Sequence, residues 1–119
     1  MFDKLKNSAG DAAIKKAVDK FGPVVNEKLA EVTKLSAVDV KNDERFKKFV
    51  ITPALVMVSA AGGGVTSLIP NFDARFVVAM LHLRDELVVV DETKNSVELA
   101  ADYQKRLPDV LVAGFKKPV

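Results

Sequence analysis

Few residues of this chain have types and spacings that could support chemistry. His82 is the only histidine, and it would be the natural general acid or base near neutral pH. Cysteine is absent, which excludes thiol catalysis, zinc–thiolate sites, iron–sulfur clusters and disulfides. No serine lies in a nucleophile-elbow pattern, and no acidic loop has the spacing of a calcium site. The sequence therefore predicts no metal, no cofactor and no catalytic residue, and it favours a non-enzymatic protein over an enzyme.

Three consecutive glycines, Gly62, Gly63 and Gly64, form the segment whose composition comes nearest to a ligand-binding loop. With Ser67 they give a G-x-G-x-x-S pattern after an apolar run, which is close to the dinucleotide-binding pattern. The third glycine of that pattern is missing, however, and Pro70 interrupts the helix whose N-terminus would hold the phosphate. We therefore rank a nucleotide-binding α/β domain last among the functions considered, and we expect a plain turn here.

Two further candidates, His82 and Arg84, fall on one predicted helix. At about 100° per residue, His82 lies on a polar strip, where a solvated or salt-bridged side chain is expected. Arg84 projects near the apolar side, and a buried guanidinium needs a carboxylate or an anionic ligand. We interpret Arg84 either as a side chain that extends its charged end to solvent or as the partner of an internal acidic residue such as Asp73, Asp102 or Asp109. The alternative is an anchor for a carboxylate or phosphate head group. Together with the three glycines, these two residues form the candidate ligand-binding set.

Charged side chains are absent from Phe49 to Phe72, whereas the rest of the chain carries one every few residues. A stretch of this length could cross a bilayer, but its three central glycines divide it into two short apolar arms. We expect these arms to be buried core, with a membrane-associated segment as the alternative. Arg45, Lys47 and Lys48 directly precede the segment and are the candidate surface for a membrane or a protein partner.

The elements that would position these residues are predicted to be helices. From Ile14 to Val32, apolar residues recur at spacings of three and four, which is the pattern of a buried helical stripe. Gly22-Pro23 interrupts this stripe with the residues that commonly end one helix and begin the next. We therefore expect one helix over residues 9–21 and another over residues 23–35.

Start and stop signals predict four further helices in the rest of the chain. Asn42 is a good N-cap, Thr52-Pro53 is a second start signal, and Asn95 or Ser96 can cap the last of these helices, which should stop at Pro108. The expected ranges are 43–52, 53–61, 71–91 and 95–107, and the first of these helices should end or kink near Thr52.

The predicted fold is mainly α and consists of one domain over residues 1–119. It would be a compact bundle of about five to six short helices around the central apolar helix over residues 71–91. Valine-rich runs leave one alternative, in which 55–59, 87–91 and 110–114 are strands of a small parallel sheet in an α/β domain.

Composition and charge narrow the function classes. The chain has 119 residues and a formal net charge of +2, with Lys and Arg interspersed among Asp and Glu. A nucleic-acid-binding protein usually clusters its basic residues on one face, so we expect no nucleic-acid partner. The N-terminal residues do not form a signal peptide, which leads us to expect a cytoplasmic location.

The apolar content is high for so small a domain, with 49% hydrophobic residues, and it suggests that apolar surface remains for a partner. We therefore predict a protein-interaction or self-association module, such as a homo-oligomer. The alternative is lipid or other amphiphile binding, or peripheral membrane association, through residues 49–72.

Overall fold

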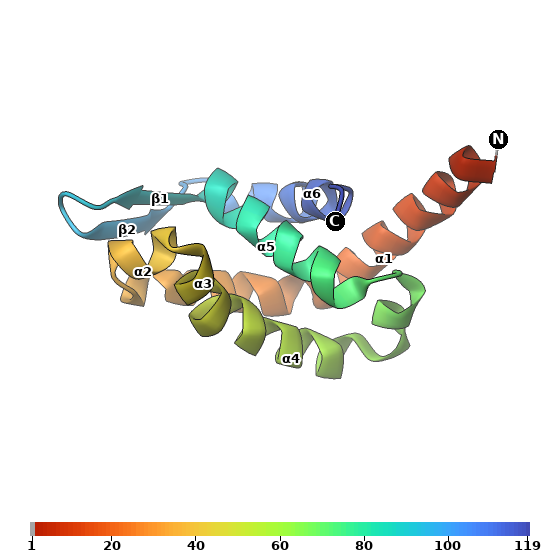
Figure 1. Ribbon diagram of the computed structural model, residues 1–119, viewed down its shortest axis with the longest axis horizontal. Coiled ribbons are helices and arrows are strands. Elements are labelled where there is room, and N and C mark those ends of the chain that lie inside the picture. The colour runs from red at the N-terminus through yellow and green to blue at the C-terminus, as the bar shows by residue number, and fades with distance from the viewer. Residues whose placement is uncertain (1) are drawn as a thin grey trace.

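The computed structural model describes the backbone of residues 2–119 and the side chains from residue 10 onward, apart from residues 62, 63 and 65. The chain is 77% helical with one small antiparallel sheet, which confirms the mainly α prediction. Helix α4 packs along α1, while α6 packs against both α1 and α5 (Figure 1). In chain order the elements are α1 (Phe2–Ala30), η1 (Glu31–Lys34), α2 (Ala37–Lys41), α3 (Asp43–Phe46), the π-helical η2 (Lys47–Ile51), α4 (Thr52–Gly62), η3 (Gly63–Leu68), α5 (Phe72–Leu87), β1 (Val88–Asp91), β2 (Ser96–Leu99) and α6 (Tyr103–Phe115).

Helix α1 continues through Gly22-Pro23, so the predicted break there is wrong. Pro23 has no N–H to donate to the Asp19 carbonyl, and in helical conformation its ring would press on a Cβ of the preceding residue. Residue 22 is a glycine and has no Cβ, which removes this second conflict. The glycine that we expected to end the helix therefore allows it to pass the proline.

The second start signal, Thr52-Pro53, changes the helix geometry without ending the helix. The Asn42 side chain caps α3 as predicted, because its Oδ1 accepts a hydrogen bond from the Arg45 N–H at 3.0 Å. Residues Lys47–Ile51 then form π-helical turns directly before the proline, and α4 follows without a gap. Helical structure therefore runs from Asp43 to Gly62.

The chain leaves α5 at Leu87, four residues earlier than predicted, and forms a β-hairpin. Val88–Asp91 pairs antiparallel with Ser96–Leu99, with Val88 opposite Leu99 and Asp91 opposite Ser96. Three successive valines favour extended structure, because their branched side chains are restricted in a helix. Asn95 has a positive φ of 50° in the turn, and its Oδ1 accepts a hydrogen bond from the Ala37 N–H at 2.9 Å, tying the hairpin to α2.

The hairpin corrects two predictions. Ser96 begins a strand and caps no helix, and the last helix instead runs from Tyr103 to Phe115 through Pro108. The α/β alternative is wrong as well, because residues 55–59 and 110–114 lie in helices and the strand over 88–91 has an antiparallel partner.

The core centres on four aromatic side chains from α1, α5 and α6, whose ring centroids lie between 5.7 and 6.3 Å apart: Phe21, Phe72, Phe76 and Phe115. Helices α5 and α6 approach each other closely at Gly114, where a Cβ would lie 2.7 Å from the Ala79 Cα. A glycine is therefore needed at this crossing for the two backbones to lie so near each other.

Candidate functional site

The glycine segment forms the connection between α4 and α5, as expected for a turn. Helix α4 ends at Gly62, and Gly63 and Gly64 begin η3. The Ser67 hydroxyl donates to the Gly64 carbonyl at 2.6 Å, so the turn is closed by its own side chain. A dinucleotide-binding loop follows a strand and leads directly into a helix. Here a helix precedes the glycines and α5 starts only at Phe72, which removes the basis for a nucleotide site.

The structure does not bring the candidate ligand-binding residues together. His82 and Arg84 lie in the last turns of α5, and at about 1.5 Å per residue Arg84 is about 18 Å along the helix from Phe72, which is the end nearer the glycines. Figure 1 shows the glycine connection and the hairpin at opposite ends of α5. His82 is partly exposed, and its side chain makes no hydrogen bond or ion pair with any of the described residues.

Arg84 holds the hairpin end of the molecule together. Its Nη1 lies 2.8 Å from the Asp43 carboxylate and its Nη2 lies 3.0 Å from that of Asp85. Nη1 also donates to the Val40 carbonyl at 3.3 Å, and the guanidinium lies over the Phe46 ring at 5.2 Å from its centroid. The side chain is 12% exposed, so this cation is nearly buried among groups that compensate its charge.

Arg84 forms ion pairs, but its partners are two exposed carboxylates and not the predicted internal ones. Asp43 comes from α3 and Asp85 is its sequence neighbour, whereas we had named acidic residues of α5 and of the region around α6. A hollow of about 250 Å³ lies beside Arg84 and is lined by Lys41, Asp85, Val88 and Val90. Because the guanidinium already contacts two carboxylates, it has little capacity left for an acidic head group.

The predicted basic surface of Arg45, Lys47 and Lys48 divides into two parts. Arg45 forms an ion pair with Asp39 at 2.7 Å, and this hydrogen bond lowers the pKa of the Asp39 carboxyl. Lys47 and Lys48 are exposed on η2, where the Lys48 ammonium lies 5.8 Å from the centroid of the Phe49 ring. The two lysines are therefore the part of this surface that remains available to a partner.

The uncharged segment is core on one side and surface on the other. Among the residues of this segment whose side chains are described, the buried ones are Val50, Ile51, Ala54, Val58, Ile69 and Phe72. Three large apolar side chains of the same segment are exposed along η2 and α4, with Phe49 at 45%, Val56 at 66% and Met57 at 38%. The prediction of buried core is thus correct for the side of η2 and α4 that packs on the protein, and wrong for the exposed side. Within the described residues, no helix is long and apolar enough to cross a membrane.

We define the α4 face as Phe49, Thr52, Val56, Met57 and Ala60, all of which are exposed. At about 100° per residue, Val56 lies roughly opposite the midpoint of the buried pair Ala54 and Val58. The buried pair faces α1, so Val56 and Met57 point away from α1, whereas Phe49 lines a hollow beside Lys28, Glu31 and Lys34. Figure 1 shows α4 on the outside of the molecule. The apolar character of the α4 face follows directly from the absence of charge between Phe49 and Phe72.

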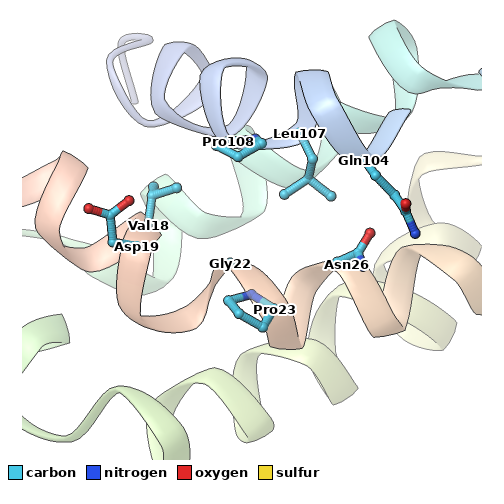
Figure 2. Close-up of a pocket in the computed structure, with 8 residues that line it drawn as sticks. All are labelled: Val18, Asp19, Gly22, Pro23, Asn26, Gln104, Leu107 and Pro108. Atoms are coloured by element: carbon cyan, nitrogen blue, oxygen red, sulfur yellow. The ribbon is translucent and has the colours of Figure 1, made fainter. Parts of the chain in front are cut away.

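A groove between α1 and α6 is a feature that the sequence did not indicate (Figure 2). It has a volume of about 300 Å³, and its lining residues are Val18, Asp19, Gly22, Pro23, Asn26, Gln104, Leu107 and Pro108. The signal that could have pointed to it is a proline inside each of the two helices, which we had interpreted as helix boundaries.

Comparison with protein-family models, with curated proteins and with solved structures gives no match to this chain. Among the described residues there is also no group of three or more His, Cys, Asp or Glu side chains arranged to hold a metal ion.

Proposed function

We propose that this protein self-associates through the α4 face and works as a homodimeric interaction module. The observation that carries the proposal is the exposed apolar surface of Phe49, Val56 and Met57, in a stretch from Phe49 to Gly62 that has no charged residue. Exposed apolar surface that is contiguous on one element marks an interaction site more often than scattered single residues do.

A second copy of the chain is a suitable occupant because the α4 face is complementary to itself. In an isologous pair the same surface of both copies meets about a two-fold axis. If the two α4 helices run antiparallel, Phe49 of one copy lies opposite Ala60 of the other, so a large side chain meets a small one. No charge has to be desolvated at the centre of this contact, which favours self-pairing over a charged partner.

The charges at the edge of the face support the same arrangement. Lys47 and Lys48 lie at the N-terminal end of the face, and α4 ends at Gly62, at the C-terminal end of the face. In an antiparallel pair, the two lysines of one copy lie near the C-terminal end of α4 of the other copy. That end carries the negative pole of the helix dipole, which attracts cations.

The size of the face sets the expected affinity. Residues 49–61 form a strip about 20 Å long and about one helix diameter wide, roughly 10 Å. This is less than the ~800 Å² that each partner buries in a typical stable interface, so we expect a weak dimer with a dissociation constant in the micromolar range or above.

Analytical ultracentrifugation tests the proposal. The weight-average mass of the wild-type chain should rise with concentration toward twice the 12.9 kDa of the monomer. Val56→Asp places a charge at the centre of the α4 face and should keep the protein monomeric. Val89→Asp is the matched control, because Val89 is a similarly exposed valine (57%) on the hairpin, and this variant should associate like the wild type.

Two results would count against self-association. One is a wild-type chain that stays monomeric at all concentrations, and the other is equal behaviour of Val56→Asp and Val89→Asp. Flotation with vesicles containing phosphatidylserine separates the alternative. A monomeric chain that floats with these vesicles, and loses this binding in Val56→Asp, would assign the α4 face and the two lysines to a membrane surface.

A further inference from the structure

A second hollow lies between η1 and η2, the two segments in which the helical chain departs from α geometry. Its volume is about 270 Å³, and its lining residues are Lys28, Glu31, Lys34, Leu35, Phe49 and Val50. Segment η1 is a 3₁₀ helix at the end of α1, and η2 is π-helical. π-Helical turns are rare and occur frequently at functional sites. This hollow is therefore a candidate site for a ligand.

The hollow joins an apolar wall to a lysine without a partner. Val50 is buried, Leu35 is partly buried, and Phe49 is 45% exposed, so these three side chains give a wall that a ligand can reach. Lys34 precedes Leu35 directly in the chain and is exposed. Its side chain makes no hydrogen bond or ion pair with any of the described residues. A free ammonium group thus adjoins the apolar wall.

The charges around the hollow favour an anion with a single charge. The Lys28 ammonium lies 3.4 Å from the Glu31 carboxylate, so these two charges largely compensate each other. Lys34 is left as the uncompensated charge of the lining. The Lys48 ammonium lies 5.8 Å from the centroid of the Phe49 ring and adds positive charge beside the same wall. The Glu31 carboxylate would repel a second negative charge on a ligand.

We infer that this hollow binds a short-chain aliphatic carboxylate. The carboxylate group lies at the Lys34 ammonium, and the alkyl chain lies against Leu35, Val50 and Phe49. The volume equals that of about nine water molecules and is just below the usual range of ligand pockets, so it suits an acid of about six carbons. The inference does not rest on self-association, because Phe49 is the one residue that the hollow shares with the α4 face.

Protein-observed NMR with hexanoate, hexanol and hexylammonium as probes tests the inference. The parent protein is the full chain with Val56→Asp, so that self-association does not contribute to the shifts. Hexanoate should cause saturable shifts in the amides of residues 31–35 and 48–50, with a millimolar dissociation constant as expected for so few atoms. Hexanol has the same alkyl chain without the charge and should bind about fivefold more weakly, since an exposed ion pair contributes up to about 1 kcal/mol. Hexylammonium should bind more weakly still, because its charge is repelled by Lys34.

Three variants of this parent chain assign the site. Lys34→Gln changes an exposed side chain, so it should melt like the parent and bind hexanoate about fivefold more weakly. Lys20→Gln is the matched control, because Lys20 is an exposed lysine of α1 outside the lining, and this variant should bind like the parent. Glu31→Gln releases Lys28 from its ion pair and should bind hexanoate about twofold more tightly.

Three results would overturn the inference. They are the absence of saturable shifts around the hollow, hexanol or hexylammonium binding as tightly as hexanoate, and equal affinities of Lys34→Gln and Lys20→Gln for hexanoate. Self-association is measured separately by ultracentrifugation of the wild-type chain, so failure of one proposal is distinguishable from failure of the other.

Discussion

Gly114→Ala is expected to separate α5 from α6 at their closest point. A Cβ at residue 114 would lie 2.7 Å from the Ala79 Cα, and 3.1 Å from both the Cβ and the carbonyl oxygen of Ala79. Carbon atoms in favourable contact are about 3.5–4.0 Å apart, so the closest overlap is about 1 Å. The nearest atom belongs to the backbone, which means that no rotation of a side chain can relieve the contact.

The magnitude follows from two opposing effects. Alanine is favoured over glycine inside a helix by up to about 1 kcal/mol, which alone would stabilise the variant. Overpacking of a well-filled core costs about 1–3 kcal/mol, and moving α6 would also disturb Phe115 in the aromatic cluster. We therefore expect the free energy of unfolding to fall by about 1–2 kcal/mol, or about 4–8 °C in the melting temperature of a domain of this size.

Urea denaturation followed by circular dichroism measures this change, with Gly10→Ala as the control. Gly10 lies inside α1, and a Cβ there has nothing within 4 Å, so its replacement should leave stability unchanged or raise it by up to about 1 kcal/mol. The double variant Gly114→Ala with Ala79→Gly should recover little stability, because the closest atom is the Ala79 Cα. Stability of Gly114→Ala at or above that of the wild type would refute the close crossing of α5 and α6.

Two other predictions concern the hairpin end of the molecule. Arg84→Ala should lower the free energy of unfolding by about 1–3 kcal/mol, because it removes the nearly buried guanidinium from Phe46 and the Val40 carbonyl. Asp43→Asn changes an exposed carboxylate and should lower it by less than about 1 kcal/mol. Equal losses of unfolding free energy in urea denaturation would contradict the structural role of Arg84. The hydrogen bond from Arg45 lowers the pKa of the Asp39 carboxyl in the folded state, so its contribution to stability is present above about pH 4 and is lost as the pH falls through the lowered value. Asp39→Asn should therefore lose less stability than the wild type between about pH 5 and pH 2 in a urea denaturation series, and parallel pH dependences of the two proteins would contradict this assignment.

Local signals in the sequence predicted the features that depend on a few neighbouring residues. The mainly α class, the cap at Asn42 and the glycine turn after α4 all follow from side-chain and backbone preferences within one or two helical turns. The same signals failed at Gly22-Pro23 and at Pro108, because a helix that is packed along its length can tolerate a proline that would end an isolated helix.

The apolar surface of the uncharged segment and the environment of Arg84 were predictable only in part, because both depend on packing between distant parts of the chain. The absence of charge from Phe49 to Phe72 is visible in the sequence, but hydropathy alone does not tell which side of a helix is covered. Arg84 was identified as needing a partner, yet its partner Asp43 is some forty positions away in the chain and comes near only through the packing of α3 beside the end of α5.

The sequence by itself therefore determined that this protein is a mainly helical domain with an uncharged middle segment, since helix propensity and charge are properties of the residues themselves. Only the tertiary structure decided that α1 covers one side of α4 and leaves Phe49, Val56 and Met57 exposed, and that α1 and α6 enclose the groove around Asn26. These surfaces depend on contacts between residues far apart in the chain. Such contacts are set by the packing of whole helices, which no local pattern of residues encodes.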